Sequence, residues 1–138
     1  YQMNFNDLKP KIIELAMQHC DIEILWLYGS YAKGTFHAGS DIDLAVVFKD
    51  WEEDIIERRL KSELLAMEWQ KELGLKDGDI SILDMEIASI PIAMSVLSTG
   101  KLLLSKNNSR QLKEQQRIMS KWEIDYLYHY KNKQAIYG

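Results

Sequence analysis

Helical and strand-like hydrophobic patterns alternate along this chain, with turn residues between them and no internal repeat. Some stretches space their apolar residues three or four apart, as on one face of a helix, and others are short runs rich in β-branched and aromatic residues. Such alternation at short spacing is typical of an α/β chain. The expected elements are a helix over 6–20, strands over 22–28 and 41–48, a helix over 50–74, a strand over 79–85, a helix over 89–100, an edge strand over 101–105 and a last helix from about 109.

Capping residues and apolar faces define the helices further. Asp50 and Glu53 have the spacing of a capping box, so the second helix is expected to begin there and to end at Gly74. The expected apolar faces are Leu8, Ile12, Leu15, Ala16 and His19 in the first helix, Ile56, Leu60, Leu64 and Met67 in the second, and Leu112, Ile118, Met119, Trp122 and Tyr126 in the last, followed by Tyr128 and Tyr130. We interpret the aromatic stripe of the last helix as core or partner surface rather than as a platform for nucleotides.

The length of 138 residues suits one compact domain, and 46% hydrophobic with 28% charged residues excludes a disordered chain. No apolar run reaches the roughly 20 residues that cross a bilayer, and residues 1–7 are polar, so we expect a cytoplasmic protein without a membrane partner. Cys20 is the single cysteine and forms no internal disulfide. We interpret it as a small core residue.

Charge divides the chain into two unequal parts. Residues 1–100 hold 9 Lys and Arg against 18 Asp and Glu, whereas residues 101–138 hold 8 against 3. A basic end of this kind suits nucleic-acid phosphates, an acidic partner or the acidic body of the same chain. Composition alone does not choose among them.

Chemistry-bearing residues gather around a loop of twelve residues, 29–40, which holds three of the seven glycines. Asp41 and Asp43 follow it and project from the same face of the next strand, about 7 Å apart. Two carboxylates so placed repel each other unless a cation lies between them, and oxygen ligands without His or Cys favour Mg²⁺ or Mn²⁺.

Gly29 and Ser30 stand where the first strand ends and a short helix can begin. Glycine lets the backbone approach a ligand closely, the helix start favours an anion, and the Ser hydroxyl adds a donor. Lys33, one turn later, is placed to neutralise phosphate charge. A strand-edge Asp-x-Asp is by itself more often solvated, and Gly-Ser is more often a plain turn, but their combination at this spacing is rare by chance. Residues 29–34 have P-loop spacing but lack the following Lys-Ser or Lys-Thr.

The pattern Tyr28-Gly29-Ser30, ten residues, Asp41-Ile-Asp43 resembles the signature of the minimal nucleotidyltransferases, small members of the DNA polymerase β-like superfamily. The resemblance extends from the first helix to Gly100, and within the family it is strongest to antitoxins paired with HEPN-domain ribonuclease toxins. It implies an α+β fold with a small mixed sheet packed with helices over 1–105. From its aromatic and basic residues we expect 106–138 to be a helical extension of the same domain that docks a partner. The resemblance also implies Mg²⁺-dependent transfer of AMP from ATP onto a tyrosine of the toxin, which silences it.

The resemblance assigns roles to individual residues. Gly29 and Ser30 hold the triphosphate, with Lys33 and Ser40 counted among the nucleotide-binding residues. Asp41 and Asp43 bind metal, and one of them helps to deprotonate the attacking hydroxyl. The family's third carboxylate lies on a later strand, where we predict Asp79, with Asp84 as the alternative and Ser81 at the position reached without a gap.

Two other functions stay open at this level. The first is nucleotidyl transfer to a small molecule such as an aminoglycoside, against which we count the short chain after Gly100, since such enzymes normally carry an added substrate-binding domain. The second is a non-catalytic antitoxin that neutralises its partner by contact alone. Direct nucleic-acid binding is not expected, and the basic end is interpreted as a docking helix.

Overall fold

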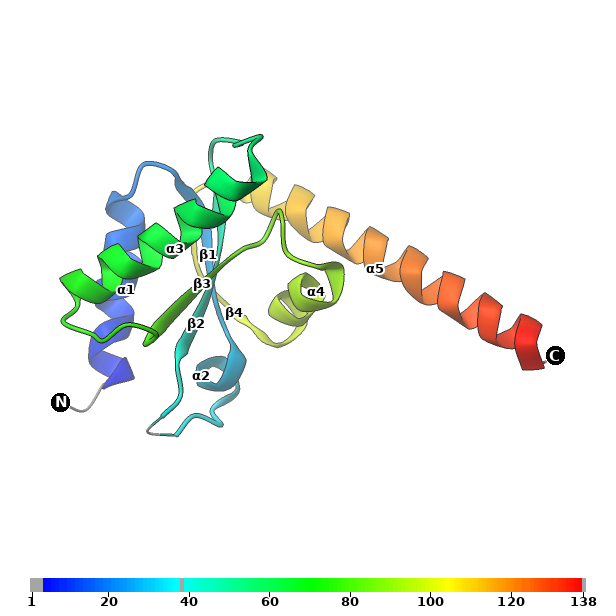
Figure 1. Ribbon diagram of the computed structural model, residues 1–138, viewed down its shortest axis with the longest axis horizontal. Coiled ribbons are helices and arrows are strands. Elements are labelled where there is room, and N and C mark those ends of the chain that lie inside the picture. The colour runs from blue at the N-terminus through cyan, green and yellow to red at the C-terminus, as the bar shows by residue number, and fades with distance from the viewer. Residues whose placement is uncertain (1–3, 38, 138) are drawn as a thin grey trace.

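The structure is a computed structural model that describes residues 4–37 and 39–137, with side chains described through residue 129 (Figure 1). The elements follow the predicted order, and a short helix does begin at Gly29, between the first two strands, where the sequence allows one. In chain order they are α1 (Phe5–Gln18), β1 (Ile22–Tyr28), α2 (Gly29–Lys33), β2 (Ile42–Phe48), α3 (Ile55–Glu72), β3 (Ile80–Asp84), α4 (Ile90–Thr99), β4 (Lys101–Ser105) and α5 (Asn108–Tyr137).

The four strands form one mixed sheet in the order β3-β2-β1-β4. The central strand β1 is antiparallel to both β2 and β4, whereas β2 and β3 run parallel. The expected small mixed sheet is therefore confirmed, and β4 is the edge strand that the sequence predicts. The parallel pairing places the starts of β2 and β3 at the same end of the sheet, beside α2.

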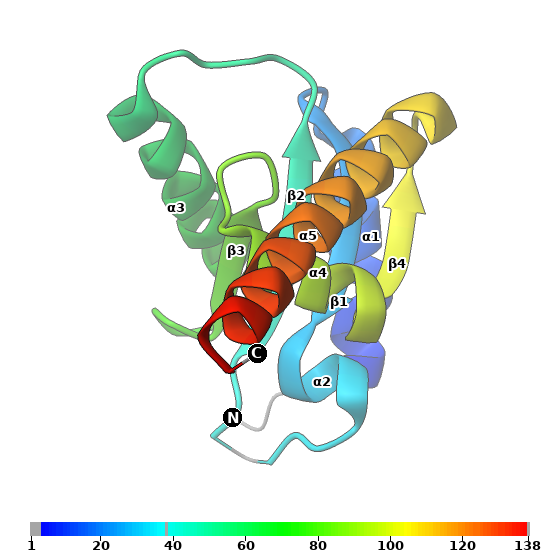
Figure 2. The same ribbon diagram turned by 90° about the vertical axis from the view of Figure 1, so that its right-hand side faces the viewer.

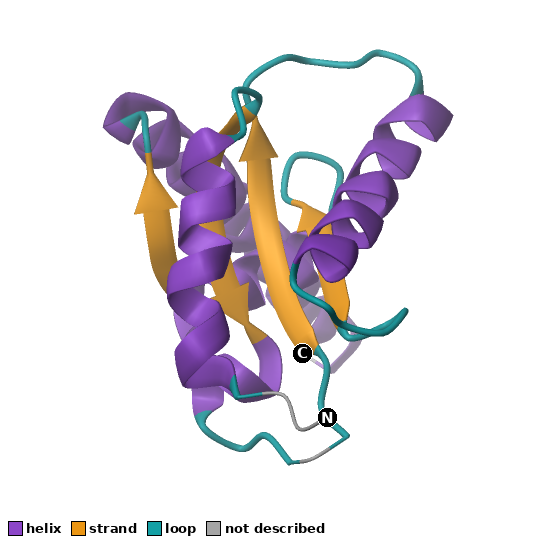
Figure 3. Cartoon of the chain, turned by 90° about the vertical axis from the view of Figure 1, so that its left-hand side faces the viewer, coloured by secondary structure: helices purple, strands orange, loops and turns teal. Residues whose placement is uncertain are grey.

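Helices cover both faces of the sheet. Helices α4 and α5 lie on one face (Figure 2), and α1 and α3 lie on the other (Figure 3). Because side chains alternate along a strand, Leu44 and Val46 pack toward α1 and α3, while Ala45 and Val47 pack toward α4 and α5. The sheet thus separates two apolar cores.

Helix α3 begins later than predicted. Its N-cap is Asp54, whose carboxylate accepts hydrogen bonds from the amides of Ile56 at 2.9 Å and Glu57 at 3.3 Å. The predicted capping box at Asp50 is wrong because the amide of Asp50 donates to Asp21 at 3.0 Å, which holds this segment at the end of the sheet. In α1 the cap is Asn4, and Leu8, Ile12 and Ala16 are buried as expected.

The apolar face predicted for α3 is also wrong. Its four residues are exposed, at 73%, 42%, 52% and 58% for Ile56, Leu60, Leu64 and Met67. The helix instead buries a face that mixes apolar and polar side chains. That face consists of Arg58, Ser62, Leu65, Ala66, Trp69 and Gln70.

Polar groups on this face find partners in and beside β3. The side-chain oxygen of Gln70 accepts hydrogen bonds from the amides of Gly78 and Ile80, each at 3.0 Å. The Arg58 guanidinium donates to the carboxylate of Asp84 at 2.7 Å and 3.3 Å. The helix is therefore held to the sheet edge by hydrogen bonds as well as by apolar contact.

The expected burial of Cys20 is wrong, and of the two interpretations of the last helix's stripe, core or partner surface, burial fits only one residue. Cys20 is exposed, because α1 ends at Gln18 and the cysteine lies in the turn before β1. In α5 only Ile118 of the predicted stripe is buried, since the helix leaves the body after its first turns (Figure 1). Its exposed members are Leu112, Met119, Trp122 and Tyr126, while the side chain of Tyr130 lies outside the described residues.

The length of α5 raises the question of a membrane span. Across the described part of the chain, none of the helices combines enough length with enough apolar character to cross a bilayer.

Candidate active site

Gly29 begins α2 directly against the start of β2. Its φ of +71° is a left-handed conformation that side chains disfavour, and a Cβ at this position would overlap Oδ2 of Asp43 and lie 3.2 Å from its Cγ. Glycine is thus required here both by the backbone and by the space. The contact brings the Gly-Ser turn and the Asp-x-Asp pair together, as the sequence predicts.

Tyr28, Asp43 and Ser81 form a row across three strands. Tyr28 pairs with Asp43 in the antiparallel ladder of β1 and β2, and Asp43 pairs with Ser81 in the parallel ladder of β2 and β3. By strand alternation Asp43 shares the face of Ala45 and Val47, toward α4 and α5. Asp41 stands exposed just before β2.

The carboxylates of Asp41 and Asp43 place negative charge at this row without a counter-ion among the described residues. Burial, and then the charge of Asp41, raises the pKa of Asp43 above its usual range. Burial, and then the charge of Asp43, raises the pKa of the Tyr28 phenol. Neither aspartate forms an ion pair with a Lys or Arg of the described residues. A cationic ligand would relieve this repulsion.

The donor set fits a hard divalent cation that a substrate completes. Among the described residues, no group of three or more His, Cys, Asp and Glu side chains is arranged to hold a metal ion. Mg²⁺ typically takes one or two protein carboxylates and completes its shell with water and substrate phosphates. Asp41 and Asp43 supply two carboxylates beside the start of α2, which agrees with this pattern.

Asp84 lies on the wrong face to act as a third carboxylate. It is buried on the α3 side of β3, where it forms an ion pair with Arg58. This side-chain direction follows from its position three residues after Ser81 on the same strand. The sequence alternative that places the third carboxylate at Asp84 is therefore excluded by the geometry.

Asp79 lies at the correct end of the sheet. Its backbone oxygen accepts a hydrogen bond from the amide of Ile42 at 2.8 Å, which places it beside the Asp-x-Asp segment. Its carboxylate, however, accepts a hydrogen bond from the amide of Lys76 at 2.8 Å, as a turn residue does. A role of Asp79 in binding metal stays a prediction, and Ser81 is the residue that lies directly beside Asp43.

The other predicted nucleotide ligands lie around α2. No side chain caps the start of this helix, and Ser30 is partly exposed in its first turn. Lys33 is exposed in the last turn. Ser40 braces the loop, because its hydroxyl accepts a hydrogen bond from the amide of His37 at 2.8 Å and its amide donates to the carbonyl of His37 at 2.9 Å.

Sequence reasoning missed Tyr31. This residue is buried within α2, and its ring stacks on Phe36 of the following loop at a centroid distance of 4.5 Å. The pKa of its phenol is raised, first by burial, then by the charge of Asp79 and last by the charge of Asp41. The sequence signal that could have indicated Tyr31 is its position two residues after Gly29, inside the short helix that begins there.

Comparison with known proteins yields a family match and one curated relative. The family model described as polymerase beta, nucleotidyltransferase matches residues 10–109. The protein adenylyltransferase MntA of Shewanella oneidensis is 31% identical over 112 residues, which cover 80% of this chain and 72% of the relative.

Solved structures share the fold. A chain of a toxin–antitoxin crystal structure with AMP-PNP superposes with a TM-score of 0.71 at 24% identity, covering 94% of this chain and 98% of the other. A chain from the structure of tri-AMPylated Shewanella oneidensis HEPN toxin in complex with MNT antitoxin superposes with a TM-score of 0.65 at 21% identity. The match covers 94% of this chain and 96% of the other. At these identities the likeness establishes the fold alone.

Proposed function

This chain belongs to the polymerase beta nucleotidyltransferase family, and on that premise we propose that it is an antitoxin that transfers AMP from ATP to a tyrosine of a HEPN-domain toxin. The observation that carries the proposal is the close approach of Gly29 to the carboxylate of Asp43. It joins a phosphate-binding turn to a pair of carboxylates with no counter-ion. That combination suits phosphoryl chemistry rather than simple protein contact.

The choice of acceptor rests on relatives. The curated relative is named a protein adenylyltransferase. Structures of the same fold contain toxin–antitoxin pairs, one with AMP-PNP and one with a HEPN toxin that carries three AMP groups.

The triphosphate of ATP would lie at the start of α2. The uncapped first turn leaves backbone amides without helical partners, and the helix dipole favours an anion there. Ser30 adds a hydroxyl donor and Lys33 a positive charge, whereas Ser40 acts indirectly by bracing the loop through its hydrogen bonds with His37.

Asp41 and Asp43 would hold Mg²⁺, or Mn²⁺ in its place. When bound, the ion would supply charge neutralisation between the carboxylates and the phosphates, and alignment of the α-phosphate. Asp79 is the candidate for a third ligand, which requires its carboxylate to turn away from the amide of Lys76.

The reaction itself is an in-line displacement. The hydroxyl oxygen of the toxin tyrosine bonds to the α-phosphorus of ATP, the bond from that phosphorus to the bridging oxygen breaks, and pyrophosphate leaves. The hydroxyl proton passes to one of the two aspartates. The protein's part is to position the reactants and to hold the developing charge.

Helix α5 is the proposed docking element for the toxin. It extends beyond the body of the protein (Figure 1), and its exposed apolar residues include Met119, Trp122 and Leu127. An exposed series of large apolar side chains next to basic residues suits a protein surface that is covered by a partner.

The test is to mix the purified chain with a HEPN-domain toxin, ATP and Mg²⁺, and to measure intact masses. We expect the toxin to gain mass in steps of one AMP and to lose its ribonuclease activity. Asp41→Asn with Asp43→Asn should abolish both changes without loss of fold. Neutralisation that persists in this variant would identify a non-catalytic antitoxin, and AMP found only on a small molecule would identify the other alternative.

A further inference from the structure

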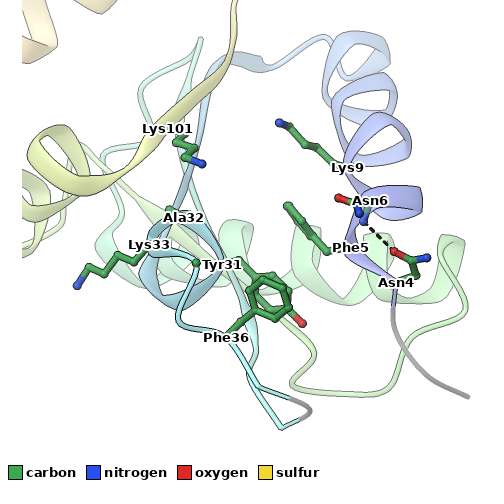
Figure 4. Close-up of a pocket in the computed structure, with 10 residues that line it drawn as sticks. Asn4, Phe5, Asn6, Lys9, Tyr31, Ala32, Lys33, Phe36 and Lys101 are labelled. Carbon is green, nitrogen blue, oxygen red and sulfur yellow. Dashed lines mark hydrogen bonds between the residues drawn. The ribbon is translucent and has the colours of Figure 1, made fainter.

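A hollow of about 740 Å³ lies on the flank of α2 that faces α1 (Figure 4). Its lining comes from the first turns of α1, from α2 and the loop after it, and from the first residue of β4. Asp43 belongs to the opposite face of the sheet, toward α4 and α5. The hollow therefore adjoins the edge at which ATP is proposed to react but lies on the other face of the sheet from Asp43.

Lysines surround this hollow in an otherwise acidic body. Lys9, Lys33 and Lys101 line it, and none of them forms an ion pair with a described residue. Lys9 and Lys101 extend into the space from opposite sides, whereas Lys33 points away (Figure 4). Two ammonium groups facing each other without a counter-ion favour an anion between them. Lysine binds phosphate as a compact point charge, while planar carboxylates are matched better by arginine.

Aromatic rings form the other wall. Tyr31 stacks on Phe36 at 4.5 Å with an interplanar angle of 9°, and Phe5 lies 4.9 Å from Tyr31 at a tilt of 39°. Phe36 is 51% exposed although the stack holds it in place. The side-chain amide of Asn6 also lines the space and has no hydrogen-bond partner among the described residues. An exposed ring beside a free amide suits a planar base that both stacks and forms hydrogen bonds.

We propose that this hollow binds a mononucleotide, with its phosphate between Lys9 and Lys101 and its base against the wall of Phe5, Tyr31 and Phe36. The volume lies within the range of small-ligand sites. This second nucleotide site is independent of the proposed AMP transfer, because it uses neither aspartate and needs no metal.

The test is a titration of the whole chain with AMP in the presence of EDTA, followed by calorimetry and by amide NMR shifts. We expect saturable binding of one AMP, with the largest shifts at Asn6, Lys9, Phe36 and Lys101. Lys9→Ala with Lys101→Ala should weaken AMP binding by about tenfold or more, because each lysine donates a charged hydrogen bond to the phosphate. Shifts confined to Gly29, Ser30 and Asp43, or no binding, would overturn the proposal.

Matched control variants distinguish a general effect of lost positive charge from a specific effect at the hollow. Lys49→Ala with Lys71→Ala removes the same charge from exposed positions outside the hollow and should leave AMP affinity unchanged. Phe36→Leu should weaken AMP but leave the affinity for inorganic phosphate as it was. If phosphate binds as tightly as AMP, or if both lysine pairs have the same effect, no mononucleotide site exists here. The AMP-transfer rate should be the same in the Lys9, Lys101 variant as in the unaltered chain.

Discussion

Gly29 and Asp43 are in such close contact that no side chain fits at residue 29. A Cβ there would overlap the carboxylate oxygen Oδ2 and approach Cγ to 3.2 Å. The same glycine has a φ of +71°, so the first residue of α2 is constrained both by its backbone conformation and by its contact with Asp43.

Gly29→Ala should abolish AMP transfer while the chain stays folded. The left-handed backbone costs about 1 kcal/mol for alanine, and the added methyl group must displace the carboxylate of Asp43. Intact mass would measure AMP transfer, urea unfolding would measure stability, and calorimetry would show whether ATP still binds.

Gly34 provides the matched control for that substitution. It has a φ of +74°, but a Cβ there would meet no atom within 4 Å. Gly34→Ala should therefore lose a similar amount of stability and retain transfer. Equal loss of transfer in both variants would mean that backbone strain, and not the contact with Asp43, is what matters.

Asp43→Asn should remove activity without destabilising the fold. The raised pKa of Asp43, which comes from burial and then from the charge of Asp41, means that its ionised form is less favoured in the folded chain than in the unfolded one. The neutral amide keeps the size and avoids this repulsion. We expect a midpoint of urea unfolding at least equal to that of the unaltered chain at pH 7, and no transfer. A clearly lower midpoint would show that the carboxylate has a structural partner.

Chelation should stop transfer and leave the fold unchanged. Asp41 and Asp43 form no ion pair with the described residues, and the two cores pack without them. EDTA should therefore abolish AMP transfer, Mg²⁺ should restore it, and far-UV circular dichroism should not change. Transfer at full rate in EDTA would contradict the proposed role of the metal.

The sequence predicts that Gly29 lies near Asp41 and Asp43 in the proposed site because the signals for this arrangement are local. Gly29 requires a special backbone conformation, and Asp41 and Asp43 share a face by strand alternation alone. The position of a third carboxylate does not follow from a local signal, because the residue opposite Asp43 depends on the register between β2 and β3. That register places Ser81 there.

The buried face of α3 could not be predicted by the same means. A hydrophobic stripe selects Leu60 and Leu64, yet both are exposed. Arg58 and Gln70 are buried instead, because β3 and the turn before it provide acceptors and donors that are distant in sequence. A local pattern contains no information about such partners.

Removing one partner of the buried ion pair of Arg58 and Asp84 should strongly destabilise the fold. Burial opposes the charge of Arg58, but the hydrogen bonds and charges of Asp84 and Glu86 outweigh burial and raise the pKa of the guanidinium. Its face also lies 4.0 Å from the ring of Trp51. Arg58→Met should cost about 3 kcal/mol, since it leaves Asp84 buried without its partner.

Two comparisons test that interpretation of the pair. Arg59→Met changes the neighbouring exposed arginine and should alter the free energy of unfolding by less than about 0.5 kcal/mol. Arg58→Met with Asp84→Leu removes both charges and should recover much of the lost stability. If the double variant is as unstable as the sum of the single ones, the two residues do not act as a pair.

Trp122→Ser should weaken toxin binding without affecting the fold. Trp122 is 40% exposed on α5, the helix that extends from the body. An interface tryptophan typically contributes about 2 kcal/mol or more, which corresponds to roughly thirtyfold in affinity. Leu64→Ser is the matched control, because Leu64 is 52% exposed on α3. Calorimetric titration of the toxin with each variant measures the two effects. If Leu64→Ser weakens binding and Trp122→Ser does not, the toxin docks on the exposed apolar face of α3 instead of on α5.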